Sequence, residues 1–256
     1  MPVTYSADGT SITYEQTGQG PLLVLVNGAL ASRNYYGEAE LAKRLSDHFT
    51  VIYYDRRGRG DSTDILPYSV DKEIADISAL IQLGAGRGYL YGCSSGAALA
   101  MSAAAQLGPG MVLKLAVYEP PFTPDRQRFD EGRKRVSQLI DDGKPADAVT
   151  AFMQVAGSTP EALAEMRQSP DWKKMVELGP TLAYDYAVLG DGDIPLTVTK
   201  QITIPALVLT GDSPMMHATA DTLAKMIPGA SRKTLGGQPH TVAPGALAPV
   251  LIDFFS

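Results

Sequence analysis

A strand, a very tight turn and a helix are predicted for residues 89–107, and this segment constrains the fold more than any other. A short apolar run leads into Gly-Cys-Ser-Ser-Gly at 92–96, and an alanine-rich run follows. Because Gly92 and Gly96 have no Cβ, a strand and a helix can approach closely around the turn. Ser94 would then lie at the apex, with its hydroxyl pushed outward and the positive end of the next helix behind it. The segment therefore predicts a nucleophile at Ser94.

Buried strands and helices alternate on both sides of this turn. Continuous apolar runs, typical of strands covered on both faces, are followed by stretches with helical periodicity. This alternation predicts an α/β fold, with a mostly parallel sheet and helices on both faces. Strands are expected in 3–17 (a hairpin) and at 22–26, 49–54, 89–91, 113–118, 204–210 and 231–235, and helices at about 36–47, 70–83, 95–107, 218–226 and 246–255.

The alternation stops between residues 122 and 200. This stretch is charged and helical and contains no convincing buried strand. We therefore expect a core formed by residues 1–121 and 201–256, with 122–200 as a helical insertion. The insertion is rich in aromatic residues, and some of them, Trp172 included, are expected to line an apolar pocket.

Composition excludes several classes of function. The 256 residues carry a formal net charge of −6, whereas nucleic acids and anionic membranes need a basic face. With one cysteine, no internal disulfide can form, and three scattered histidines predict no metal site. We expect a cytoplasmic protein with no signal peptide, no membrane span and no cofactor, whose partner is a small molecule with an apolar part. The oligomeric state stays open.

A serine nucleophile needs a base, and His240 is the best candidate. It lies in a loop after the last predicted strand, whereas His48 and His217 are expected to be solvated residues at helix ends. Ligands of parallel sheets bind at the carboxyl ends of the strands. The polar residues that follow the predicted strands should share that edge, and they are Asn27, Asp55, Ser94, Glu119 and Asp212.

In order and spacing, the segments 27–29, 55–62, 92–96 and 211–212, together with His240, resemble the α/β-hydrolase family across essentially the whole chain. The resemblance implies an eight-stranded sheet, a serine nucleophile, a histidine base and an acid that orients the histidine. It also implies that the helical insertion is the family's cap.

The resemblance further implies an oxyanion hole made by two backbone N–H groups, those of Ser95 and Ala29. The family usually has His-Gly before the second donor, and this chain has Asn27-Gly28. The change should leave the backbone donor in place but alter what the side chain binds. Asn27 and Gly28 are therefore predicted to contact substrate.

The catalytic acid is not where the family usually keeps it. The expected Gly-x-x-Asp is Gly211-Asp212-Ser213-Pro214 here. Glu119, at the end of the strand before the insertion, is the first candidate, and Asp212 is the alternative. A third reading is that no acid is present, which would leave a reduced activity.

The segment 55–62 and the residue Cys93 are interpreted as structural. The glycines and charges of 55–62 suit a tight loop that supports the site. Cys93 is interpreted as a small packed side chain and not as a second nucleophile.

These features together predict a serine hydrolase that acts on an ester-like small molecule (a carboxylic ester, lactone or thioester) through an acyl-enzyme on Ser94. One alternative is a non-hydrolytic enzyme of the same fold, such as a lyase, a perhydrolase or a biosynthetic cyclase. Another is a catalytically dead binding protein.

Overall fold

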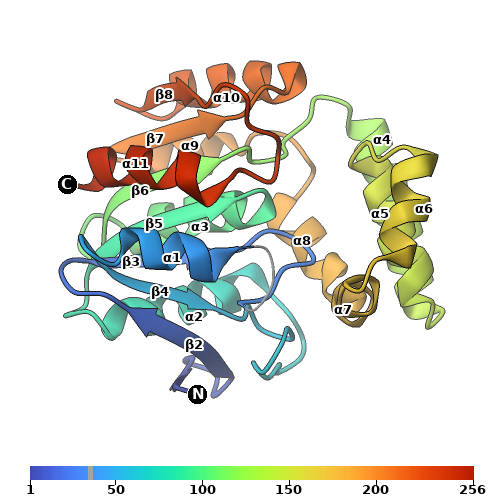
Figure 1. The fold of residues 1–256 in the computed structure, drawn as a ribbon, viewed down its shortest axis with the longest axis horizontal. Helices are drawn as coiled ribbons and strands as arrows, with labels where there is room; N and C mark the ends of the chain where they lie inside the picture. Colours follow the sequence, from blue (N-terminus) through green and yellow to red (C-terminus); the bar gives the residue numbers. More distant parts are fainter. Residues whose placement is uncertain (34–36) are drawn as a thin grey trace.

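A single sheet of eight strands organises the protein (Figure 1). The computed structural model describes residues 1–33 and 37–256. The strand order is β1-β2-β4-β3-β5-β6-β7-β8; β1 and β2 form an antiparallel hairpin, β2 pairs antiparallel with β4, and all other pairs are parallel. The predicted α/β-hydrolase fold is confirmed. The strands are β1 (Val3–Tyr5), β2 (Ser11–Thr17), β3 (Leu22–Val26), β4 (Thr50–Tyr54), β5 (Gly88–Cys93), β6 (Val112–Tyr118), β7 (Ala206–Thr210) and β8 (Ser231–Thr234).

Both faces of the sheet are buried, which explains the continuous apolar runs. In β3, Leu23 and Leu25 pack into one core, while Leu22, Val24 and Val26 pack into the other. The first core is closed by α1 (Glu38–Leu45) and α11 (Pro244–Phe255). The second is closed by α2 (Val70–Gln82), α3 (Ser95–Leu107) and α10 (Pro214–Met226).

Two helices begin earlier than predicted, and a proline explains each start. Helix α10 begins at Pro214 and α11 at Pro244, and the fixed φ of proline suits the first turn of a helix. The helix predicted at 36–47 corresponds to α1; its expected first residue, Tyr36, lies outside the described residues.

Between β6 and β7 the chain forms a helical lobe beside the sheet, at the right of Figure 1. Helix α8 lies between this lobe and the body and packs against α3. Helix α9 crosses the predicted boundary at residue 200 and packs against α3 and α10, so its contacts are with the core layer. We call residues 122–195 the cap below. Its helices are α4 (Arg126–Asp141), α5 (Pro145–Val155), α6 (Pro160–Gln168), α7 (Trp172–Leu178), a short 3-10 turn (Gly179–Thr181) and α8 (Leu182–Leu189); α9 (Leu196–Gln201) follows.

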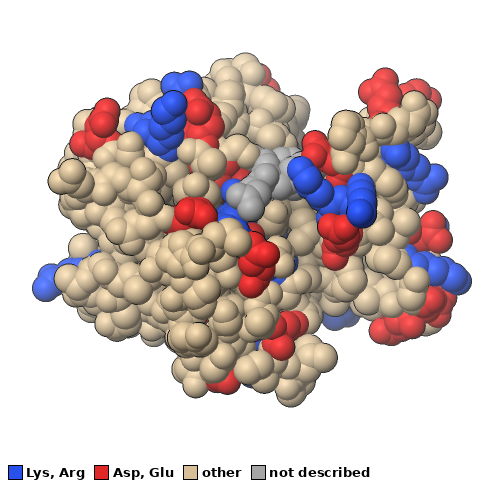
Figure 2. All heavy atoms as spheres, turned by 60° about the horizontal axis from the view of Figure 1, so that its bottom comes forward, with Lys and Arg blue, Asp and Glu red and all other residues tan. Residues whose placement is uncertain are grey.

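The surface in Figure 2 carries acidic and basic side chains interspersed, and many of them lie on the cap side at the right. In the part of the chain that the structure describes, no helix combines the length and the apolar character that crossing a membrane requires.

Candidate active site

The backbone around Ser94 is strained and tightly packed. Ser94 adopts φ 54° and ψ −129° between β5 and α3, a conformation rare for a residue with a side chain. A Cβ on Gly92 would lie 2.4 Å from the carbonyl oxygen of Gly96, and one on Gly96 would lie 2.3 Å from that of Asn27. Only glycine fits at either position, so these glycines hold Ser94 at the apex of the turn.

The segment predicted to donate to the oxyanion packs directly against Ser94. A Cβ on Gly28 would lie 2.9 Å from the Cβ of Ser94. Among the described residues, the N–H groups of Ala29 and Ser95 have no hydrogen-bond acceptor. Both donors therefore remain available to a bound oxygen.

Of the two candidate acids, the structure brings Glu119 to His240. Oε2 of Glu119 lies 2.6 Å from Nδ1 of His240, and Oε1 accepts a hydrogen bond of 2.8 Å from the N–H of Gly211. Glu119 itself has φ 47°, the left-handed region that few side chains adopt. Asp212 instead accepts from the N–H of Gly237 at 2.7 Å, and among the described residues His240 is paired with Glu119 and not with Asp212.

The loop that carries His240 is held against the ends of β6 and β7. The Tyr118 hydroxyl donates to the carbonyl of Pro239 at 2.7 Å. Gly211 comes so close to the same loop that a Cβ there would lie 2.0 Å from the carbonyl oxygen of Gln238. The His240 side chain remains half exposed, which lets it face a cavity while its Nδ1 is fixed.

The hydroxyl of Ser94 and the His240 ring border the same cavity. The hydrogen bonds of the described residues do not include one between them, so proton transfer requires the imidazole to close on the hydroxyl. Such contacts often tighten only when substrate binds.

The other two histidines differ from each other. His48 is exposed, as predicted. His217 is half-buried in α10, and its Nε2 lies 2.6 Å from the carbonyl oxygen of Gly211. Neither borders the cavity.

A cavity of about 720 Å³ opens between the sheet edge and the cap. This is within the size range of small-molecule sites. The core side contributes Asn27, Gly28, Ala29, Ser94, Ser95, Glu119 and His240, and the cap contributes Phe122, Phe129, Phe152, Met153 and Tyr186. The aromatic lining agrees with the expectation of an apolar pocket.

Trp172 does not line this cavity. Its side chain packs against the core that α2, α3 and α10 close, and the guanidinium of Arg167 lies 5.9 Å from the ring centroid. The predicted substrate contact of Trp172 is therefore not supported by its position, and we assign it none.

Two titratable groups beside the cavity are shifted by burial. Burial raises the pKa of the Cys93 thiol to about 12, so the thiol stays protonated at neutral pH and is a poor nucleophile. Burial also raises the pKa of the Glu38 carboxyl to about 8. Described His, Cys, Asp and Glu side chains do not gather into any group that could hold a metal ion.

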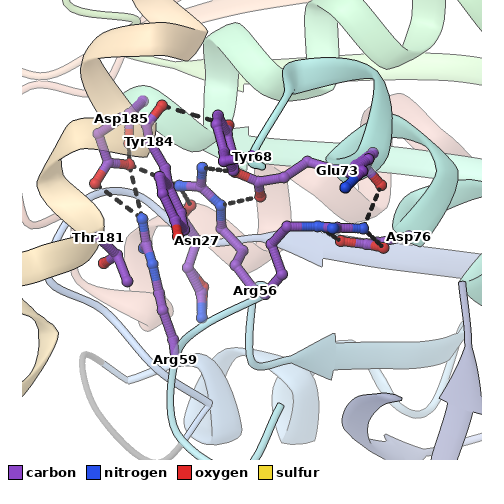
Figure 3. Close-up of polar contacts among 12 residues, drawn as sticks. Asn27, Arg56, Arg59, Tyr68, Glu73, Asp76, Thr181, Tyr184 and Asp185 are labelled. Carbon is purple, nitrogen blue, oxygen red and sulfur yellow. Dashed lines mark hydrogen bonds and ion pairs between the residues drawn. The ribbon is translucent and has the colours of Figure 1, made fainter. Parts of the chain in front are cut away.

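The loop at 55–62 supplies three buried arginines, each paired with carboxylates (Figure 3). Arg56 makes two hydrogen bonds of 2.7 Å to Glu73, and Arg57 makes bonds of 2.9 and 2.7 Å to Asp76. Arg56 and Arg59 also bind Asp185, which comes from α8 of the cap. The sequence predicted a supporting loop, but Asp185 was missed. A signal was present, because Asp185 is the only charged residue in the otherwise apolar helix Leu182–Leu189.

A model of the alpha/beta hydrolase family matches residues 23–249, and the chain therefore belongs to this family. The resemblance expected from the sequence is confirmed. Among solved structures, an alpha/beta hydrolase from Sphaerobacter thermophilus DSM 20745 is 46% identical, with a TM-score of 0.89 and full coverage of both chains.

Two curated relatives have more specific names. The 2-(acetamidomethylene)succinate hydrolase of Mesorhizobium japonicum is 28% identical over 245 residues, which cover 92% of this chain and 84% of the relative. The N-formylmaleamate deformylase of Pseudomonas putida is 37% identical over 116 residues, which cover 44% of this chain and 42% of the relative. Together with the family, these relatives support hydrolase activity.

Proposed function

We propose that this protein is a serine hydrolase that cleaves a small acyl compound through an acyl-enzyme on Ser94. The observation that carries the proposal is the 2.6 Å contact between Glu119 and His240, on the cavity that Ser94 also lines. Nucleophile, base and orienting acid are recognised by their mutual geometry and not by their positions in the sequence.

In the proposed reaction, Nε2 of His240 takes the hydroxyl proton of Ser94 while Oγ attacks the acyl carbon. The carboxylate of Glu119 holds the imidazole through Nδ1 and stabilises its charged form. The N–H groups of Ala29 and Ser95 bind the developing oxyanion. His240 then gives its proton to the leaving group, and a water molecule, activated by the same imidazole, releases the acyl group.

An ester-like substrate with an apolar part fits the aromatic lining of the cap side. A carboxylic ester, a lactone or a thioester would each present the carbonyl that this arrangement attacks. A second candidate is an N-acyl compound, because the two curated relatives are named for an acetamidomethylene compound and for a deformylase.

Hydrolysis of p-nitrophenyl acetate and p-nitrophenyl butyrate by wild type and Ser94→Ala tests the proposal. Wild type should hydrolyse at least one of them, and Ser94→Ala should lose nearly all of that rate. Activity that survives the substitution would exclude Ser94 as the nucleophile. An N-formyl anilide assayed in parallel distinguishes the ester from the N-acyl candidate.

A further inference from the structure

The Asp185 carboxylate lies at the meeting point of the cap and the segments around Ser94. It is buried, and Oδ1 accepts hydrogen bonds from Ser95 Oγ at 2.7 Å and from Arg56 Nη1 at 2.7 Å. Nη2 of Arg59 lies 2.9 Å from Oδ1 and 2.8 Å from Oδ2. Figure 3 shows both arginines extending from the loop toward this one carboxylate.

Asp185 is a stable anion in this position. Burial alone would raise its pKa, but the guanidiniums of Arg59 and Arg56 and the hydroxyl of Ser95 outweigh burial and lower it. Arg56 has a second carboxylate partner in Glu73. Among the described residues, Asp185 is the one carboxylate paired with Arg59. The position of the Arg59 guanidinium therefore depends on Asp185.

Arg59 connects this carboxylate to one donor of the proposed oxyanion hole. Its Nη1 donates to the carbonyl oxygen of Gly28 at 2.6 Å. That carbonyl and the N–H of Ala29 belong to the same peptide unit. A trans peptide is planar, so its C=O and N–H point in opposite directions. A cation bound to the oxygen thus fixes where the N–H points, and it also polarises the peptide so that the N–H is a stronger donor.

Ser95 connects the same carboxylate to the second donor. The Ser95 hydroxyl is held by Asp185, and the Ser95 backbone N–H is the other proposed donor. The side-chain bond limits how the first residue of α3 can rotate. The orientation of both N–H groups therefore depends on contacts with one carboxylate, which comes from a different part of the chain.

We infer that Asp185, on the cap helix α8, is a positioning residue that orients both backbone donors of the oxyanion hole, through Arg59 on one side and Ser95 on the other. The inference rests on the proposed function. It makes the cap a part of the catalytic arrangement as well as a wall of the substrate cavity.

The test compares Asp185→Asn and Ser95→Ala with wild type on p-nitrophenyl acetate and on its thionoester, in which sulfur replaces the carbonyl oxygen. Loss of an oxyanion donor typically costs about 10²–10³ in kcat, and misorientation should cost about 10–100-fold. We expect kcat for the oxygen ester to fall by about 10–100-fold, the cost of misorientation, with KM changed less than about threefold. The ratio of oxygen-ester to thionoester rates should fall as well, since sulfur gains little from the donors.

Tyr184→Phe is the matched control. Tyr184 is the neighbouring residue on α8, and its hydroxyl also ties the cap to the core by binding Asp64, but it does not line the cavity. Loss of this contact should leave kcat and the oxygen-to-sulfur ratio unchanged. Ser95→Ala removes a single hydroxyl and keeps the backbone N–H, so it tests the Ser95 side of the inference even if Asp185→Asn fails to fold.

A folded Ser95→Ala variant with the wild-type kcat and the wild-type ratio would overturn the inference. A wild-type protein that hydrolyses neither ester and whose Ser94 does not react with a fluorophosphonate would overturn the proposed function instead. The two failures are therefore distinguishable.

Discussion

Oε2 of Glu119 lies 2.6 Å from Nδ1 of His240, across 121 residues of sequence. The other oxygen of Glu119 binds the N–H of Gly211, so both oxygens of this buried carboxylate have partners. A carboxylate fixed on two sides holds the imidazole in one tautomer and one orientation. The geometry supports Glu119 as the acid of the proposed triad.

Glu119→Gln should lower kcat by about 10²–10⁴, because an amide cannot stabilise the imidazolium and can select the wrong tautomer. Steady-state ester hydrolysis measures this loss. Asp212→Asn is the matched control and should change kcat by less than about threefold, since its side-chain oxygen can still accept from Gly237. A larger loss in Asp212→Asn than in Glu119→Gln would reverse the assignment of the acid.

Gly211→Ala should displace the loop that carries His240. The added Cβ would lie 2.0 Å from the backbone oxygen of Gln238, which cannot move without the loop. We expect kcat to fall at least about tenfold, because small misplacements of catalytic groups are costly. Gly236→Ala adds a Cβ in open space in the same region and should leave kcat unchanged. Equal activities of the two variants, measured at matched folded concentrations, would contradict this role of Gly211.

Glu38 should make stability depend on pH. Its pKa rises from 4.5 to about 8 on folding, mainly by burial, so folding favours the protonated carboxyl. Its stabilising contribution is complete below about pH 4.5 and is lost as the pH rises through about 8. Glu38→Gln should therefore be more stable than wild type at pH 9, by a few kcal/mol at most at about 1.4 kcal/mol per pKa unit.

Denaturant unfolding at pH 5 and pH 9 measures the effect of Glu38. The difference between wild type and Glu38→Gln should be larger at pH 9. Glu40→Gln, at an exposed position on the same helix, is the matched control. A Glu38→Gln difference that is the same at both pH values would show that Glu38 does not titrate in this range.

Phe152→Ala should widen the cavity and favour longer acyl chains. Phe152 lines the cavity from the cap side, and its ring packs against Tyr186 with 6.1 Å between centroids. We expect the rate ratio of p-nitrophenyl octanoate to acetate to rise about tenfold, the range expected for changes in a hydrophobic pocket. Trp172→Phe, outside the cavity, should leave the ratio unchanged. A ratio that responds to Trp172 and not to Phe152 would place the acyl group elsewhere.

The fold, including the tight turn around Ser94, could be predicted from sequence because the signals are local. The run Leu22–Val26 reads as a strand covered on both faces, and its side chains do divide between two cores. The glycines at 92 and 96 mark two positions of the turn without room for a Cβ, because a Cβ there would lie 2.4 Å or less from a backbone oxygen.

The contacts that complete the site depend on residues far apart in the chain. Sequence alone left Glu119 and Asp212 as alternatives, because both follow a strand and reach the same sheet edge. Only the path of the 238–240 loop decides which of them meets His240. Asp185 lies 90 residues from Ser95 and 126 from Arg59, so no local pattern joins them. Sequence alone could not separate Trp172 from the aromatic residues that line the cavity, because helical aromatic residues pack inward or line a cavity with the same periodicity.

The most direct test of the central claim is to trap the acyl-enzyme. The protein is mixed with p-nitrophenyl butyrate, quenched in acid within the first turnovers, digested and examined by mass spectrometry. The peptide containing Ser94 should gain the mass of one butyryl group, and this adduct should be absent from Ser94→Ala. Continued turnover with no acyl group on Ser94, or with the acyl group on another residue, would contradict the claim.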